Sequence, residues 1–60
     1  MAQISYDSEV NILSVRLSNH KIVDSDTGDH CVIDYDKDGN IVNIDVMEVN
    51  LEKLLKASKK

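Results

Sequence analysis

The sequence contains no Pro, Phe or Trp, only two Gly and a single Cys, Cys31. A lone Cys excludes a disulfide within the chain and is typical of a protein kept in a reducing compartment. No apolar run approaches the roughly 18 residues of a membrane span, and residues 1–13 lack the basic and apolar regions of a signal peptide. We therefore expect a cytoplasmic protein that does not enter a membrane.

The length limits the number of domains. We expect one small domain, residues 1–60, because 60 residues are too few for two. A chain this short buries only about 60% of the surface that it exposes when unfolded. Such a domain gains stability when a second copy adds to its core. The length therefore favours self-association, in the simplest case as a homodimer.

The charges are divided unevenly along the chain. Residues 1–50 carry ten acidic and three basic side chains, and residues 51–60 carry one acidic and four basic side chains. The acidic body repels phosphate backbones, and four Lys without Arg or interleaved aromatic residues make a weak nucleic-acid footprint. We expect no nucleic-acid partner, and we expect any heterologous partner to be a basic protein.

The apolar residues favour strands, since 13 are Val or Ile and only five are Leu, and β-branched side chains fit a pleated sheet. Alternating polar and apolar residues predict a first hairpin from residues 3–6 and 12–17. A short strand is expected at residues 22–24, and an exposed mobile loop at residues 25–29. The sheet as a whole is predicted to cover residues 3–49.

The strongest local pattern is a second hairpin, in which residues 30–35 and 41–49 flank a turn centred on Asp38 and Gly39. The structural residues of this turn are predicted to be Asp36, Asp38, Gly39 and Asn40, with Asp36 paired to Asn40. The register that follows sets Tyr35 opposite Ile41, Asp34 opposite Val42, and Cys31 opposite Asp45.

In that register both faces of the hairpin are partly apolar. Val32, Val42, Ile44 and Val46 share one face, and Cys31, Ile33, Tyr35, Ile41 and Met47 lie on the other with Asn43 and Asp45. One candidate cover is a helix over residues 51–58, capped by Asn50 and carrying a stripe of Leu51, Leu54 and Leu55. The predicted fold is α+β: an antiparallel β-meander of four to five strands with one short C-terminal helix.

Residues 34–45 also reproduce the spacing of a calcium-binding loop, with Asp34, Asp36 and Asp38 as candidate ligands. Such a loop lies between helices and folds back so that its twelfth residue, here Asp45, meets its first. In the predicted hairpin Asp45 would lie about 10 Å from Asp34. A structural turn is therefore the favoured interpretation, and weak calcium binding is the alternative.

Other chemistry-bearing residues give weaker patterns. His30 and Cys31 are neighbours on a predicted strand and point to opposite faces, so they cannot chelate one metal ion. A nucleophilic site would need Cys31, His20 and one of eight Asp residues to converge in a cleft, and so many available acids make the match uninformative. We expect no enzyme activity and no cofactor.

Two stretches, residues 4–18 and 32–46, carry a pattern that includes Tyr6-Asp7 and, from residue 34, Asp-Tyr-Asp-Lys-Asp-Gly. The chain thereby resembles the small prokaryotic domain-of-unknown-function family numbered twenty-two eighty-three. The resemblance covers about residues 3–50 and implies a β-meander with a C-terminal helix that commonly self-associates. Members are sometimes encoded beside small toxin-like proteins, and no catalytic residue is established for the family. This chain departs from the pattern at Asn11, Ser14, Asn43 and Asp45.

Together these observations predict a non-enzymatic homodimeric protein-interaction module. Its candidate interface is Leu51, Leu54 and Leu55, and its acidic body suits a basic partner, as in a toxin-antitoxin-like pair. The alternative is a calcium-binding domain that uses the turn from Asp34 to Asp38.

Overall fold

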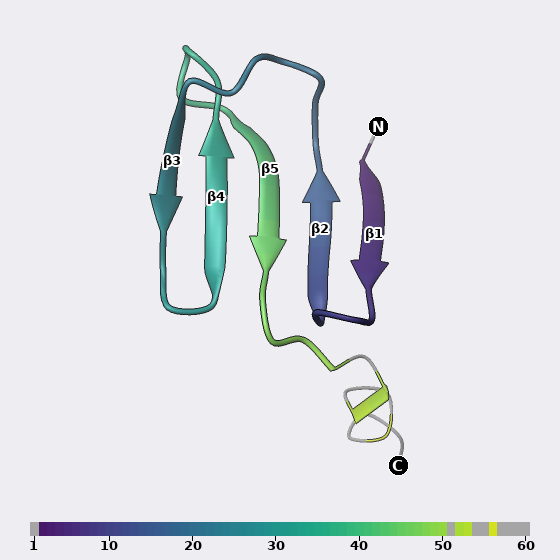
Figure 1. Cartoon of the computed structure of the whole chain (residues 1–60). Helices are drawn as coiled ribbons and strands as arrows, with labels where there is room; N and C mark the ends of the chain where they lie inside the picture. Colours follow the sequence, from purple (N-terminus) through teal and green to yellow (C-terminus); the bar gives the residue numbers. More distant parts are fainter. Residues whose placement is uncertain (1, 51, 54–55, 57–60) are drawn as a thin grey trace.

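A computed structural model of the chain describes residues 2–50, 52–53 and 56. Five strands form one antiparallel sheet (Figure 1), and their order across it is β1-β2-β5-β4-β3. The strands are β1 (Gln3–Asp7), β2 (Ile12–Arg16), β3 (Asp24–Thr27), β4 (Cys31–Tyr35) and β5 (Ile41–Val46). Among the described residues, no helix has the length and hydropathy needed to cross a membrane.

The predicted α+β class was wrong, because the fold is all-β and no helix is among the elements of the described residues. Asn50 does accept a hydrogen bond from the backbone N–H of Lys53, at 2.9 Å. Glu52, Lys53 and Lys56 have helical conformation but make up no element of the described residues, and the rest of the helix predicted over residues 51–58 lies outside the described residues. The predicted apolar stripe of Leu51, Leu54 and Leu55 lies outside the described residues.

Strand order shows that the sheet is not a simple meander. The first hairpin is confirmed, with Tyr6 opposite Leu13, and β3, β4 and β5 follow one another as neighbours. β5 then pairs with β2 on its other side, so the connection from β2 to β3 crosses one end of the sheet (Figure 1). Four of the six residues of β5 are Ile or Val, and this strand gains most by pairing along both edges.

The segment predicted as a mobile loop, residues 25–29, is largely strand β3. Its four residues are polar and exposed, which is why their composition indicates a loop. Pairing with β4, for example Ser25 with Asp34, nevertheless holds them extended. Tertiary pairing here overrides a weak local preference, and the acidic side chains of β3 protect an edge of the sheet against further strand addition.

A β-bulge at Val42 changes the predicted register of the second hairpin. Tyr35 lies opposite Ile41 as expected, but Asp34 lies opposite Asn43, so Val42 is an extra residue on β5. The carbonyl of Val42 accepts the backbone N–H of Leu17 at 2.7 Å, and its side chain is fully buried. The predicted pairing of Asp34 with Val42 was therefore wrong, because Val42 bonds toward β2 instead.

The bulge also sorts the side chains into two chemically different faces. Residues directly opposite one another share a face, and the observed pairs place Ile44 with Val15 and Ile33. The predicted grouping of Val32 with Ile44 and Val46 was wrong for this reason, since Val32 lies opposite Asp45. We call one side the apolar face, formed by Ile4, Tyr6, Leu13, Val15, Cys31, Ile33, Tyr35, Ile41, Ile44 and Val46. The opposite side is the polar face, which includes Ser5, Ser14, Arg16, Ser25, Asp34, Asn43 and Asp45.

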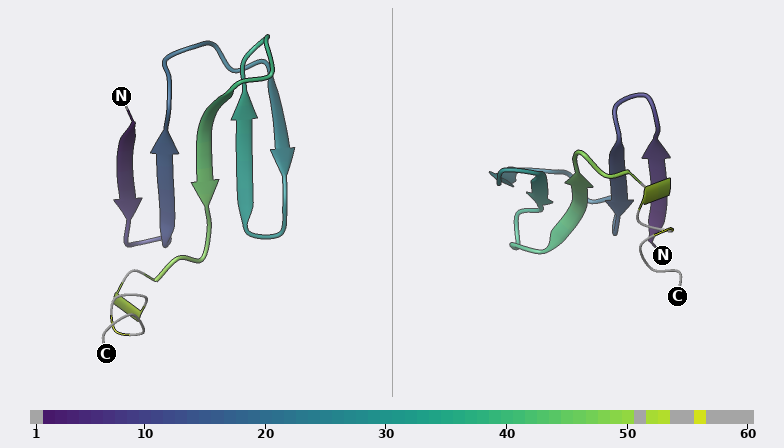
Figure 2. Two further views of the ribbon diagram at one scale, coloured as in Figure 1. Left: turned by 180° about the vertical axis from the view of Figure 1, so that it is seen from behind. Right: turned by 90° about the horizontal axis from the view of Figure 1, so that it is seen from below.

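The sheet is a single curved layer, and no described element covers either face (Figure 2). Among the described residues, Val42 is the buried hydrophobic residue and Asp36 the buried charged one. Apart from Val42, the apolar side chains of the five strands are partly buried or exposed.

Candidate functional site

The turn between β4 and β5 is built around the carboxylate of Asp36. Its Oδ1 accepts the backbone N–H groups of Asp38 and Asn40, both at 2.9 Å. The backbone N–H of Asp36 donates to the carbonyl of Asn40 at 2.9 Å, and Gly39 has φ +82°, a value that glycine adopts without strain. These bonds join the residues predicted for the turn, Asp36, Asp38, Gly39 and Asn40, between β4 and β5.

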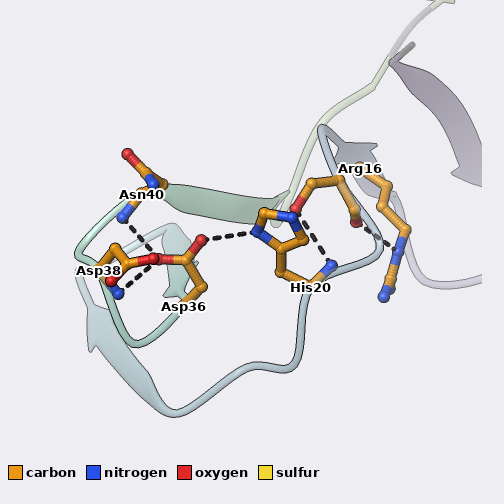
Figure 3. Close-up of polar contacts among 6 residues, drawn as sticks. Arg16, His20, Asp36, Asp38 and Asn40 are labelled. Carbon is orange, nitrogen blue, oxygen red and sulfur yellow. Dashed lines mark hydrogen bonds and ion pairs between the residues drawn. The ribbon is translucent and has the colours of Figure 1, made fainter.

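The other oxygen of Asp36 holds a histidine from a distant part of the chain (Figure 3). Nδ1 of His20 lies 2.8 Å from Oδ2 of Asp36; the His20 side chain is 66% exposed and that of Asp36 is 3% exposed. An ionised carboxylate only accepts hydrogen bonds, so Nδ1–H donates. His20 therefore fastens the connection between β2 and β3 to the turn between β4 and β5.

These contacts shift the acidity of the buried carboxyl group. The hydrogen bond from His20 and the backbone N–H of Asn40 lower the pKa of Asp36 from 3.8 to about 2, against the opposing effect of burial. A carboxyl group whose folded pKa is lowered adds stability above its unfolded pKa, and this stability is lost as the pH falls toward the folded value.

We therefore expect the free energy of unfolding to fall as the pH is lowered from about 4 to about 2. Urea unfolding at a series of pH values measures it, and the Asp36→Asn variant, which has no carboxyl group at this position, should show a flatter profile. Equal pH dependence of the two proteins would contradict the assignment to Asp36.

An open hollow of about 350 Å³ lies beside this pair, lined by His20, Lys21, Val23, Asp36, Lys37 and Asp38. A histidine oriented by a buried carboxylate is an arrangement found in general-base catalysis. In that chemistry the histidine takes the proton of a nucleophile within reach, which is a side-chain hydroxyl, a thiol or a water molecule. The residues that line the hollow include no hydroxyl or thiol group, and the contact that the structure shows for the His20 ring joins the loop to the turn.

The candidate calcium ligands do not converge. Asp36 directs both oxygens to His20 and the turn backbone, while Asp34 contacts Ser25 at 2.6 Å and Asn43 at 3.4 Å. No group of three or more His, Cys, Asp or Glu side chains that could hold a metal ion occurs in the described part of the chain. The structure gives the calcium alternative no support.

A line of polar side chains crosses the polar face over four strands. From β3 to β2, hydrogen bonds join Ser25 to Asp34, Asn43 to both Asp34 and Asp45, and Ser14 to Asp45. The bulge creates this line by setting Asn43 opposite Asp34, and so brings Asp45 nearer to Asp34 than the predicted register does. These cross-strand bonds stabilise the sheet and keep this face polar.

The other histidine and the cysteine lie away from His20. Nδ1 of His30 is 2.9 Å from the carboxylate of Glu48, in an exposed pair that contributes little to stability. Cys31, a free thiol, begins β4, whereas Asp36 follows the other end of that strand and holds His20 there. The three residues of the weak nucleophilic hypothesis therefore do not meet in one cleft.

Apart from the turn, the main feature is the apolar face, which has acidic side chains along its β3 edge. Asp24 and Asp26 of β3 lie on the same side as Tyr35 and Ile33, their partners on β4. Partial burial, a hydrogen bond with Asp26 and the charges of Asp26 and Asp24 raise the pKa of Tyr35. The apolar face thus spans β1, β2, β5 and β4, with β3 as an acidic rim.

Sequence reasoning missed two parts of this arrangement. The pairing of His20 with Asp36 joins residues 16 positions apart, and no spacing rule links a loop histidine to a turn. The apolar face was missed because the alternation of residues 41–46 suggests no bulge. A signal was present in Asn43 and Asp45, whose polar side chains suit a solvated face better than an apolar one.

A family model described as "Protein of unknown function (DUF2283)" matches residues 3–50. Neither curated proteins nor solved structures give a match to the chain. The matched range contains all five strands, the Asp36 turn and His20. The predicted family resemblance is confirmed, and the chain belongs to the DUF2283 family.

Proposed function

We propose that this protein is a non-enzymatic, homodimeric protein-interaction module. The observation that carries the proposal is the apolar face, which no described element covers. Ile4 on that face is 71% exposed, although an isoleucine gains about 1.5–3 kcal/mol by full burial. The face extends over four strands, and a second copy of the chain would remove its apolar side chains from water.

The predicted interface residues Leu51, Leu54 and Leu55 lie outside the described residues. On the polar face a hydrogen-bonded line of polar side chains crosses four strands. Among the described residues, the open apolar face is therefore the surface that best suits a dimer contact. It gives a single contiguous area, which suits one symmetric interface.

The acidic body supports a further partner of opposite charge. Asp24 and Asp26 of β3 and Asp29 of the turn that follows are exposed. A negative edge attracts basic proteins and steers their approach. We propose a basic protein as heterologous partner, in keeping with the toxin-antitoxin-like pairs that the family resemblance implies. The lone Cys31 supports a cytoplasmic location.

Molar mass measured by sedimentation equilibrium tests the homodimer. We expect a dimer at micromolar concentrations, and we expect Ile4→Asp to raise the dimer dissociation constant by at least tenfold, because it places a charge on the apolar face. Ile4 is exposed in the single chain, so this change should cost the fold little.

Ser5→Asp is the matched control, since it adds the same charge one residue away on the polar face. We expect its dissociation constant to stay within about threefold of the unchanged protein. A mass of one chain at several hundred micromolar would refute the proposal, and equal weakening by both variants would show that the apolar face is not the interface.

A further inference from the structure

The apolar face carries acid at only one edge, and this asymmetry restricts how two copies can pack. We propose that two chains form a face-to-face sandwich whose two-fold axis runs parallel to the strands, between β2 and β5, with both β3 strands outside the contact. The inference rests on the homodimer proposed above and specifies its geometry.

The charges of β3 decide between the two simple directions of the axis. An axis perpendicular to the strands stacks every strand on its own copy, so β3 would face β3 across the roughly 10 Å that separates packed sheets. Asp24 and Asp26 of both copies would then be enclosed together, and like charges in a desolvated contact oppose association. An axis parallel to the strands reverses the strand order of the second copy and keeps the acids of the two copies apart.

The position of the axis follows from the same residues. An axis through β5, the middle strand, would lay β3 over β1 of the second copy and bring Asp26 against Ile4. Moving the axis midway between β2 and β5 places β2 over β5 and β1 over β4, and leaves β3 beyond the partner sheet. Asp24 and Asp26 then remain in solvent.

This arrangement also pairs apolar side chains at equal heights. Ile4, Val15, Ile44 and Ile33 form one row across the sheet, because each lies opposite the next. An axis parallel to the strands preserves height, so Val15 lies over Ile44 of the second copy and Ile4 over Ile33. The most exposed side chain of the apolar face, Ile4, thereby gains a cover.

The free edge of β1 offers a different contact, in which two copies pair β1 with β1 and make a continuous sheet. That contact satisfies backbone groups of the edge strand. It leaves Val15, Ile33 and Ile44 as exposed as they are in one chain. The sandwich removes this apolar surface from water, which is the dominant favourable term in protein association.

Isotope-filtered NOE spectroscopy on a mixture of labelled and unlabelled chains tests the geometry without any substitution. We expect contacts between copies from Val15 to Ile44 and from Leu13 to Val46, and none that involve β3. Contacts of Ile4 with Ile4 or of β3 with β3 would establish the perpendicular axis, and backbone contacts between β1 and β1 would establish edge pairing. Either result overturns this inference and leaves the homodimer standing, whereas a monomeric mass overturns both.

A second measurement tests whether the acidic side chains of β3 lie outside the contact. The Asp26→Asn variant removes one charge from each copy and keeps the shape of the side chain. Because β3 lies outside the proposed contact, its dimer dissociation constant should stay within about threefold of the unchanged protein. A larger change, and above all a tighter dimer through relieved repulsion, would place β3 inside the contact and refute the geometry.

Discussion

The Val42→Ala variant is expected to unfold with about 2 kcal/mol less free energy than the unchanged protein, because two methyl groups leave a fully buried site. Val42 is 0% exposed and is the one buried hydrophobic residue among those described. Its carbonyl, which accepts the N–H of Leu17, is not altered. The loss therefore measures side-chain packing at the bulge, and urea unfolding should show a midpoint lower by roughly 2 M.

Val10→Ala is the matched control, since it removes the same two methyl groups from a side chain that is 56% exposed. We expect a change within about 0.5 kcal/mol. Both proteins must be compared at one concentration, because self-association raises apparent stability. Equal losses in the two variants would show that Val42 does not hold the centre of this fold.

The Asp36→Ala variant should lower the thermal midpoint by on the order of 10 °C, as measured by far-ultraviolet circular dichroism. It removes the acceptor of two backbone N–H groups in the turn and also the partner of His20. The turn between β4 and β5 and the connection between β2 and β3 lose their common support. A small sheet with few buried residues has little stability in reserve.

Two further variants separate these contributions. Asp36→Asn keeps an oxygen for the backbone N–H groups and loses the charge that faces His20, so its loss should be smaller than that of Asp36→Ala. Asp38→Ala removes the same charge from an exposed position and should shift the midpoint by about 2 °C or less. Equal effects of Asp36→Ala and Asp38→Ala would contradict the structural role of Asp36.

In the second hairpin, neighbouring residues account for the turn but not for the register of the two strands. Asp36, Gly39 and Asn40 were predicted to form the turn, because Asp bonds to nearby N–H groups and Gly accepts a positive φ. Both properties act within five residues. The bulge at Val42 lies only two residues after this turn, but it depends on a distant segment. There the carbonyl of Val42 accepts a hydrogen bond from the backbone N–H of Leu17, on the other side of β5.

The candidate sites likewise depend on contacts between distant segments, which sequence spacing does not reveal. The calcium pattern of Asp34, Asp36 and Asp38 is a match of spacing, and spacing alone does not say what each oxygen will bond. In the folded chain Ser25, Asn43 and His20 reach Asp34 and Asp36 from other elements. The predicted interface residues Leu51, Leu54 and Leu55 lie outside the described residues, whereas the apolar face is assembled from β1, β2, β5 and β4.

The sequence by itself determined that this protein is a small domain rich in strands, that residues 36–40 reverse the chain, and that it belongs to its family. These properties depend on composition and on bonds between near neighbours. Tertiary structure alone decided the central position of β5, the formation of strand β3, the bulge at Val42 and the contact between His20 and Asp36. Each of these depends on the free energy of pairing between segments far apart in the chain, and that free energy decides which side of the sheet is apolar.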